Sequence, residues 1–388
     1  MTEIEFARAV RETGGRAFIA GGHVRDKLRG ALPRDRDYVV TGIAEVAFTV
    51  TFPRAMRVGR GFPVYLLEVD GDMREVAFAR RERKTGPGHL GFGISASPGI
   101  TIEDDLYRRD TTMNSMAKSL ETGELIDPYG GARDIARRVI RATSEHFADD
   151  PVRALRAARH SAQFGYAIEP GTIRLMEKCR DELAREPGER LTNELREALR
   201  CDAPSVFFRR LKEAGILGAA YPQIASLAGI NADERRHPEN DSFDRAMQVL
   251  DRTAAMTART EARFAALAMG PGMTALREWN ARMPLPSLWT RCAEFAITER
   301  SRIHNISKPE EIADFMERIR NHPLALDGII AIARADACGT PPFLERAPKL
   351  LEAMGSVTGD AIPDYLKGPS RGAWLREKKI EAVTRATG

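Results

Sequence analysis

Hydrophobic and polar positions alternate in short runs over the first 140 residues and then recur at helical spacing. Runs rich in β-branched residues lie at 16–22, 36–42, 47–52, 62–71, 73–81 and 124–131, and each predicts a β-strand. From about residue 140, apolar residues recur every three to four positions, as in VRALRAARHSAQF at 152–164. The pattern predicts an α+β chain, in which an N-terminal mixed α/β head precedes an all-α remainder.

Two neighbouring segments of the head carry specific predictions. Residues 64–80, VYLLEVDGDMREVAFAR, predict a hairpin because two alternating apolar runs flank the turn Asp70-Gly71-Asp72, and Glu75 then lies on its second strand. Residues 79–100 are rich in glycine, proline and serine and lack helical or strand periodicity until their end. They predict a mobile loop, either an ordinary long connection or a functional lid.

Composition and charge limit where the protein can act and how it can bind a polyanion. No apolar run is long enough to span a membrane and no leader pattern opens the chain, which predicts a soluble cytoplasmic protein without a membrane partner. The 59 basic and 55 acidic residues nearly cancel, so a polyanion site must come from local clusters of charge. The four cysteines, Cys179, Cys201, Cys292 and Cys338, include no C-x-x-C pair and are expected to be reduced and structural.

The segment from Ala20 to Asp37 combines a Gly-Gly turn, a helix start and an Asp-x-Asp pair. Alternate residues of a strand project from one face, so Asp35 and Asp37 are expected to point together, away from Arg36. Adjacent carboxylates repel unless a cation lies between them, and Mg²⁺ with substrate phosphates is the usual solution. The turn Gly21-Gly22 lets backbone N–H groups approach a triphosphate. The combination indicates nucleotidyl transfer, although either part alone would be an ordinary turn.

Two further clusters can bind a nucleotide. In RRDTTMN, Arg108 can neutralise phosphate while Asp110 and Asn114, one helical turn apart, can hold a ribose hydroxyl; the alternative is a capped helix with its arginines in solvent. In DDPVRALRAARH, an acidic start precedes a stripe of arginines. Asp and Arg together can read the edge of a base, whereas the alternative is a set of surface ion pairs.

These motifs, GGHVRD with RDRD, RRDTTMN, DPYGG, DDPVRALRAARH and ERLTNEL, resemble in content and order those of the class II tRNA nucleotidyltransferases, the bacterial CCA-adding enzymes and their poly(A) polymerase relatives in the polymerase-β superfamily. The resemblance covers residues from about 15 to 225 and returns at LKGPSRG near the end of the chain. It implies a nucleotidyltransferase head at 1–140, a base-recognising neck at 141–225, a helical body at 226–335 and a tRNA-binding tail at 336–388, in a slender molecule.

The resemblance also implies residue roles. Asp35 and Asp37 would bind two Mg²⁺ ions, with Glu75 as a third catalytic carboxylate. The other nucleotide contacts would be Gly21, Gly22, Arg25 and Asp26 near the phosphates, Arg108, Asp110 and Asn114 at phosphate and sugar, and Asp149, Asp150, Arg153, Arg156 and Arg159 at base and triphosphate. Asp150 and Arg153 match the base-reading pair, and Arg190 and Glu194 match the helix that braces it.

The activity implied is addition of CCA, or part of it, to tRNA 3′ ends from CTP and ATP without a template. A CC-adding enzyme, an A-adding enzyme or a poly(A) polymerase of the same fold are alternatives, and the full length of the loop at 84–100 favours enzymes that add A. A catalytically silent RNA-binding protein is a remote alternative. The intact acidic residues argue against it, because clustered negative charge repels an RNA backbone.

Five positions depart from the family pattern. Asp149 replaces the usual Glu, so the contact that orients the base-reading arginine must be re-formed by a backbone shift or a water. His160 stands where Phe is usual. In the branch with an appended phosphohydrolase domain, a His-Asp pair would stand at Met269-Gly270 and another His at Arg245. Without these ligands the body is predicted to be vestigial and structural, and His237 to be a surface or loop-anchoring residue.

Overall fold

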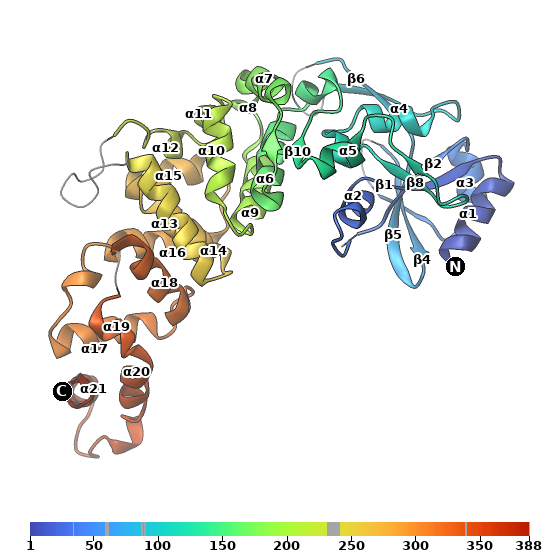
Figure 1. Cartoon of the computed structure of the whole chain (residues 1–388). Helices are drawn as coiled ribbons and strands as arrows, with labels where there is room; N and C mark the ends of the chain where they lie inside the picture. The colour runs from blue at the N-terminus through green and yellow to red at the C-terminus, as the bar shows by residue number, and fades with distance from the viewer. Residues whose placement is uncertain are drawn as a thin grey trace. The chain divides into compact units, whose positions relative to one another are not determined.

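The structure is a computed structural model that describes residues 1–33, 35–58, 62–86, 88, 91–230, 241–337 and 340–387. Most strands lie in the N-terminal part and the later elements are helices, which confirms the predicted α+β class (Figure 1). The chain forms two compact units. One comprises Met1–Leu191 with Arg209–Ala220, and the other comprises Thr192–Phe208 with Tyr221–Gly388. The finer division into head, neck, body and tail stays a prediction.

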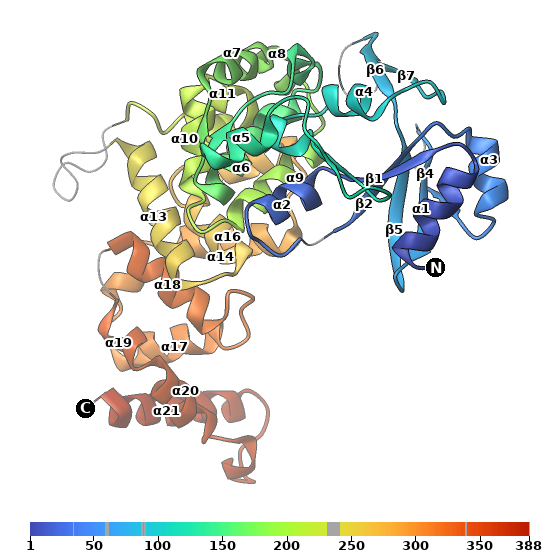
Figure 2. The ribbon, with the colours of Figure 1, turned by 45° about the vertical axis from the view of Figure 1, so that its right-hand side comes forward.

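A seven-stranded sheet lies at the centre of the first unit (Figure 2). Its order is β3 (Met56–Val58), β4 (Val64–Val69), β5 (Asp72–Phe78), β2 (Asp37–Thr41), β1 (Arg16–Ala20), β8 (Ala117–Ser119) and β9 (Leu125–Ile126). β2 and β5 run parallel, whereas the other neighbouring pairs are antiparallel. The parallel pair matters for function because it places the start of β2 beside the middle of β5.

The two faces of this sheet have different partners. Tyr38 of β2 packs against Phe6 of α1 (Glu3–Glu12), with ring centroids 5.2 Å apart. The next residue, Val39, points to the opposite face and joins a buried core with Leu106 of α4 (Ile102–Tyr107). Odd-numbered positions of β2 therefore belong to the α4 face.

The predicted hairpin at 64–80 is confirmed. β4 and β5 pair from Val64↔Ala77 to Val69↔Asp72, and the two turn residues Asp70 and Gly71 both have positive φ, 53° and 82°. Two-residue hairpin turns favour positive φ at both central positions because their twist then matches that of the strands.

One strand prediction is wrong. Residues 47–52 lie largely within helix α3 (Glu45–Thr51). Phe48 and Phe52, four residues apart, are buried with their ring centroids 4.8 Å apart, whereas Val46 and Val50 are 75% and 76% exposed. The β-branched residues of this run therefore face solvent, and burial of the two phenylalanines at helical spacing outweighs their strand propensity.

The prediction for residues 79–100 also needs correction. This segment contains two antiparallel strands, β6 (Arg81–Lys84) and β7 (Phe92–Ser95), paired from Arg81↔Ser95 to Lys84↔Phe92. All four residues of β6 are charged, so no alternation of apolar and polar positions marked this strand in the sequence. Lys84 Nζ also lies 2.6 Å from Glu182 Oε1 of α8 (Arg180–Leu183).

The helices predicted after residue 140 are present, and the Pro-containing stretches 202–204, 221–222, 270–272 and 321–323 fall between or at the edges of helices. The other elements of the first unit include α2 (Gly22–Leu28), α5 (Gly131–Ala136), α6 (Val152–Phe164), α7 (Pro170–Lys178), α11 (Leu217–Ala220), the short 3-10 helices η1 (Thr112–Asn114) and η2 (Glu145–Asp149), and the paired strands β10 (Val139–Ile140) and β11 (Ala167–Ile168). α9 (Gly188–Leu199) and α10 (Ser205–Glu213) each contain residues of both units.

The second unit is helical. Its elements are α12 (Pro222–Ala225), α13 (Ser242–Met256), α14 (Thr260–Ala268), α15 (Gly272–Arg282), α16 (Ser287–Glu299), η3 (Ile303–Asn305), α17 (Pro309–Ile319), α18 (Ala325–Ala337), α19 (Pro342–Glu345), α20 (Ala347–Gly355), η4 (Gly359–Ala361) and α21 (Pro369–Thr387).

Cys179, Cys201 and Cys292 are buried thiols, as predicted, whereas Cys338 lies outside the described residues. None of the described helices is both long and apolar enough to cross a membrane.

Candidate active site

The predicted carboxylate pair lies at the N-terminal end of β2. Asp37 is the first residue of the strand and Asp35 precedes it, so only Asp37 belongs to the sheet ladder. Between them, Arg36 donates to Glu3 of α1 at 3.4 Å and to Asp70 at 3.1 Å. Arg36 and Tyr38 thus point toward α1, and both aspartates are exposed. This alternation supports the expectation that Asp35 and Asp37 share the opposite face.

The electrostatics of the pair fit a divalent cation. Partial desolvation and then the nearby Asp35 carboxylate raise the pKa of Asp37, against smaller opposite effects of Arg109 and His23. Two carboxylates that destabilise each other's charge gain from a shared cation with oxygen preference, such as Mg²⁺. Within the described part of the chain, no group of three or more His, Cys, Asp or Glu side chains is arranged to hold a metal ion.

Glu75 lies where the sequence predicted it, on the strand beside the pair. It pairs directly with Asp37 in the parallel register of β2 and β5, and it is exposed. Paired residues of adjacent strands project from the same face, so Glu75 and Asp37 are neighbours on the α4 face. Its catalytic role stays a prediction.

The Gly-Gly turn leads from β1 into α2. Gly21 has a φ of 78°, and a Cβ at this position would lie 2.7 Å from Nη1 of Arg109. Its N–H donates to the Met116 carbonyl at 2.9 Å, and Gly22 begins α2. Contact of the two glycines with a triphosphate stays a prediction.

A chain of hydrogen bonds connects α2 to the RRDTTMN motif. Arg25 donates from Nη1 to Oδ1 of Asn114 at 2.8 Å and from Nε to Oδ1 of Asp26 at 2.8 Å. Asn114 in turn donates from Nδ2 to Oδ1 of Asp110 at 2.9 Å. The predicted nucleotide-binding residues of two distant motifs thus form one network, although 89 positions separate Arg25 from Asn114.

Asp110 is the buried end of this network. Only 6% of the residue is exposed, and it accepts from Arg156 Nε of α6 at 2.8 Å. Burial opposes its ionisation, but the Arg156 guanidinium outweighs burial and holds the pKa of Asp110 below its ordinary value. The carboxylate therefore remains charged and links α6 to the RRDTTMN motif.

His160 lies on the same face of α6 as Arg156, one turn later. It is 2% exposed and stacks on Phe164 with ring centroids 5.4 Å apart. Phe164 also contacts the guanidinium groups of Arg25 and Arg29, which lie 4.9 and 3.7 Å from its ring centre; Arg25 is in α2 and Arg29 directly follows it. Burial, followed by the charge of Arg159, holds the pKa of His160 well below its usual value. The neutral ring is thus a packing link between α6 and α2.

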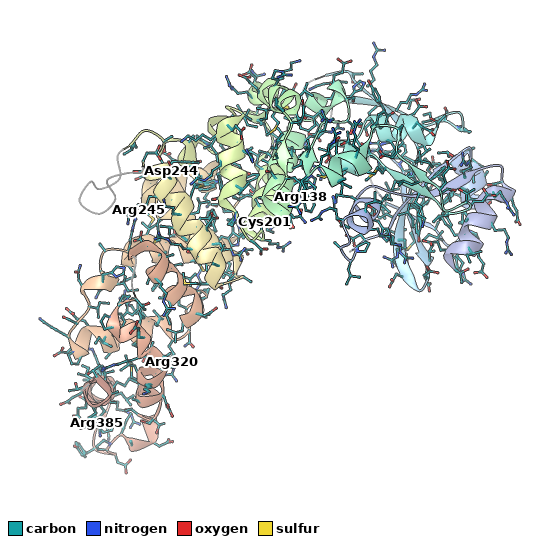
Figure 3. The ribbon with its side chains drawn as sticks, in the orientation of Figure 1. Arg138, Cys201, Asp244, Arg245, Arg320 and Arg385 are labelled. Atoms are coloured by element: carbon teal, nitrogen blue, oxygen red, sulfur yellow. The ribbon has the colours of Figure 1, made fainter. Side chains whose placement is uncertain are left out.

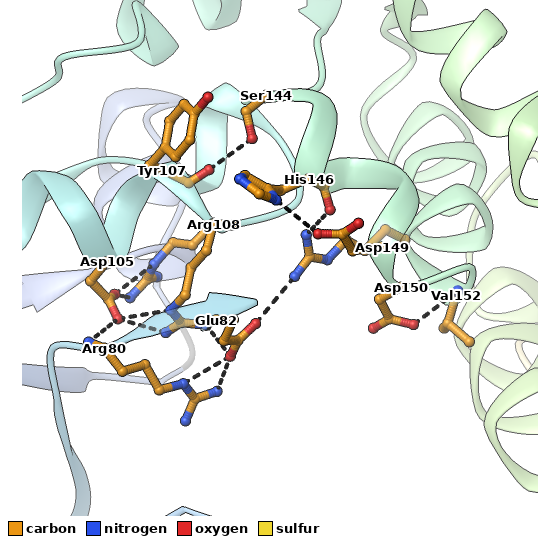
Figure 4. Close-up of polar contacts among 12 residues, drawn as sticks. Arg80, Glu82, Asp105, Tyr107, Arg108, Ser144, His146, Asp149, Asp150 and Val152 are labelled. Atoms are coloured by element: carbon orange, nitrogen blue, oxygen red, sulfur yellow. Dashed lines mark hydrogen bonds and ion pairs between the residues drawn. The ribbon is translucent and has the colours of Figure 1, made fainter. Parts of the chain in front are cut away.

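Glu82 of β6 gathers three arginines (Figure 4). Its carboxylate lies 2.8 Å from Arg80, 2.8 Å from Arg108 and 3.7 Å from Arg153. The predicted phosphate contact Arg108 also donates to the buried Asp105 at 2.6 Å. In this conformation Arg108 is therefore neutralised by two carboxylates.

The predicted base-reading pair is divided between different partners. Asp150 accepts from Arg190 Nη2 at 2.9 and 3.0 Å, so Arg190 does brace this region. Arg153 is 9% exposed and donates to the His146 carbonyl at 2.7 Å. Asp149 Oδ2 lies 2.8 Å from Nδ1 of His146, the residue whose carbonyl Arg153 binds. Arg159 donates to Gln163 at 3.3 Å.

Two central residues were missed from the sequence. Asp105 is 1% exposed and binds Arg108 and Arg109, and its spacing of three and four residues from them was a usable signal. Glu82 carried no such signal, because its partners come from other elements of the fold.

Comparisons with known proteins agree with this geometry. A sequence profile described as "Poly A polymerase head domain" matches residues 17–141, and one described as "Probable RNA and SrmB- binding site of polymerase A" matches residues 165–227. The protein named Multifunctional CCA protein in Methylococcus capsulatus is 38% identical over 408 residues, which cover 95% of each chain. Its namesake in Nitrosococcus oceani is 33% identical over 402 residues, with 95% of this chain and 98% of that one covered.

The chain belongs to the CCA-adding tRNA nucleotidyltransferase family. Members of this family are enzymes of nucleotidyl transfer, which generally use divalent metals. The solved CCA-adding enzyme of Bacillus stearothermophilus in complex with CTP superposes with a TM-score of 0.69 at 25% identity, covering 99% of this chain and 91% of that one. A CCA-adding enzyme with ATP has the same fold, with a TM-score of 0.74 at 22% identity and coverage of 98% and 89%.

In this CCA-adding family member, an ion cluster lies at Arg245 and Met269, two of the positions that depart from the family pattern. Arg245 lies beside Asp244 on α13 (Figure 3) and donates to Asp336 of α18 at 3.2 Å. Arg300 binds the same carboxylate at 2.8 and 2.9 Å and donates to the Met269 carbonyl at 3.1 Å. Two guanidinium groups therefore neutralise Asp336, next to Met269. His237 lies outside the described residues.

Proposed function

We propose that this protein adds CCA, in whole or in part, to the 3′ ends of tRNA in the cytoplasm, using CTP and ATP and no nucleic-acid template. The observation that carries the proposal is the exposed pair Asp35 and Asp37, with Glu75 in register beside Asp37 and Arg109 between this pair and the Asn114 network. Clustered carboxylates beside a cationic network suit a metal-bound triphosphate.

Asp35 and Asp37 would hold two Mg²⁺ ions, since both are exposed on one face and repel each other. When bound there, divalent cations would supply activation of the tRNA 3′-hydroxyl and neutralisation of the triphosphate. Glu75 would add negative charge at the same place. The protein's own contribution is to fix Asp37 and Glu75 on a rigid sheet, which places reacting groups at little entropic cost.

The network around Asp110 would bind the nucleotide's sugar and phosphates. The Asn114 amide can accept from or donate to ribose hydroxyls and the Asp110 carboxylate can accept from them, while Arg25, Arg156 and Arg109 supply positive charge toward phosphate. Asp150 and Arg153 would read the base. For this, Arg153 must exchange its contacts with His146 and Glu82 for contacts with the base.

The test is an incorporation assay with three tRNAs, ending before CCA, after C and after CC, each offered CTP, ATP and both. Completion of CCA on all three supports the full activity. Addition of CC alone, or of A alone to the third tRNA, identifies a companion-dependent enzyme of the same fold, and long A tails identify a poly(A) polymerase. No incorporation on any substrate, with tRNA binding intact, would favour a silent RNA-binding protein.

Asp35→Ala and Asp37→Ala provide the matched variants. Each should abolish incorporation while tRNA binding, measured by fluorescence anisotropy, stays close to that of the wild type. The surface variant Asp72→Asn serves as a control, because this exposed residue lies at the hairpin turn and bonds only its neighbour Arg74 among the contacts described. Retained incorporation in both active-site variants would refute the assignment.

A further inference from the structure

His23 makes a contact that the proposed chemistry has not yet used. It is the second residue of α2, only 7% exposed, and its Nδ1 lies 3.1 Å from the main-chain carbonyl oxygen of Asp35. A carbonyl oxygen can only accept, so Nδ1 carries the proton and donates it. The contact therefore fixes the tautomer of the ring.

The backbone of Asp35 needs such a support. β2 begins at Asp37, where pairing with Glu75 holds the chain, and Asp35 lies outside this ladder. Among the hydrogen bonds of the described residues, that from His23 is the one we find at the Asp35 main chain. The sheet thus holds one carboxylate of the pair, and α2 holds the segment that carries the other.

α2 is a suitable anchor because it packs against β1, α5 and η1 of the same unit. Arg25, two residues after His23, is bonded to Asn114 and Asp26. The hydrogen bond from His23 therefore fixes the Asp35 backbone to the same helix that is bonded to the nucleotide-binding network.

The ring is not explained by packing alone. Its Nε2 is buried and has no hydrogen-bond partner among the described residues. A buried polar atom without a partner costs stability, which an apolar residue at this position would avoid. Residues that break this rule are often retained at functional sites.

We propose that His23 is a positioning residue, which donates from Nδ1 to the Asp35 carbonyl and so sets the separation of the Asp35 and Asp37 carboxylates for divalent cations. This inference rests on the proposed function. Supporting residues that orient metal ligands typically change metal affinity or activity by about 10- to 100-fold when they are lost.

The first test measures the protonation of the His23 ring in the wild-type protein. The wild-type protein is labelled with ¹⁵N-histidine, and His23→Asn is used only to assign the His23 signals. We expect a protonated Nδ1 and an unprotonated Nε2 at neutral pH. A ring protonated only at Nε2 would overturn the proposal, because Nδ1 could then not donate to a carbonyl.

The second test compares His23→Leu, which keeps the packing without a donor, with His23→Asn, whose amide can donate. His23→Leu should weaken Mn²⁺ binding to the nucleotide-free protein, followed by electron paramagnetic resonance, about tenfold, and lower kcat with little change in the KM for CTP. His23→Asn should recover most of the Mn²⁺ affinity and most of the kcat that His23→Leu loses. His322→Leu, in the second unit, should leave Mn²⁺ binding unchanged.

Unchanged Mn²⁺ binding in His23→Leu would overturn the proposal, as would equal losses in both His23 variants in proportion to their melting temperatures. Either result, with an active wild type, leaves the proposed function standing. An inactive wild type would instead remove the proposed function itself.

Discussion

Arg156 of α6 donates from Nε to Oδ2 of Asp110 at 2.8 Å, while Asn114 donates to the other oxygen of the same carboxylate at 2.9 Å. Asp110 is buried, but the side chain of Arg156 is 41% exposed. The exposed arginine can therefore turn toward a nucleotide, whereas the carboxylate is fixed. Asp110 is the stationary part of the predicted sugar site.

Asp110→Ala should reduce the use of ribonucleotides more than that of deoxyribonucleotides. The variant removes the acceptor that holds Asn114 and a carboxylate that Arg156 binds, so contacts to a ribose hydroxyl are lost. We expect the kcat/KM for CTP to fall at least about tenfold and the ratio of CTP to dCTP use to fall with it. Steady-state kinetics with both nucleotides measure this. An unchanged ratio would contradict the sugar-binding role.

His160→Phe should make stability less sensitive to acid. The folded protein keeps His160 neutral because burial, then Arg159, lowers its pKa, whereas the unfolded chain binds a proton near pH 6.5. Stability is therefore lost as the pH falls below about 6.5. Phenylalanine keeps a ring against Phe164 but cannot bind a proton.

Urea unfolding of both proteins at pH 7 and pH 5.5 checks this. The loss of unfolding free energy between the two pH values should be about 1 kcal/mol smaller in the variant. Parallel pH profiles would show that His160 does not titrate between the folded and unfolded states as expected.

Gly21→Ala should destabilise the protein and slow incorporation. A Cβ would clash with Nη1 of Arg109, whose Nη2 donates to Asp105 at 3.0 Å, and the φ of 78° is unfavourable for alanine. We expect a loss of about 2 kcal/mol in unfolding free energy.

Gly30→Ala is the matched control for Gly21→Ala. Its φ is 72°, but no atom lies within 4 Å of the added Cβ. It should cost only backbone strain, about 1 kcal/mol, and leave incorporation near the wild-type rate. Equal effects of the two variants would mean that the contact with Arg109 is unimportant.

Glu82→Gln should change nucleotide choice. The substitution keeps the shape of the side chain but removes the charge that Arg80, Arg108 and Arg153 share, so Arg153 is held less firmly. If Arg153 reads the base, the preference between CTP and ATP at each step should shift by several-fold. Competition assays with both nucleotides measure it, with the exposed Glu124→Gln as control. An unaltered preference with altered stability would assign Glu82 a structural role only.

The local pattern of this sequence was sufficient for much of the fold and for the acidic pair. Strand alternation predicted a common face for Asp35 and Asp37, the Asp-Gly turn predicted the hairpin, and Glu75 lies on the second strand of that hairpin as predicted. Helices such as α6 followed from apolar spacing. These features depend on interactions between residues close in the chain, which local sequence encodes.

Only tertiary structure decided which charged groups meet. Arg25 reaches Asn114, Arg156 reaches Asp110 and Glu82 reaches Arg153 across long stretches of chain, and no spacing rule connects them. Tertiary packing also turned residues 47–52 into α3, because burying Phe48 and Phe52 outweighed strand propensity. The sequence by itself therefore determined the chemistry of the residues and most of their local conformation. The folded core determined their partners, because charges separated in sequence interact only when packing brings them within a few ångströms.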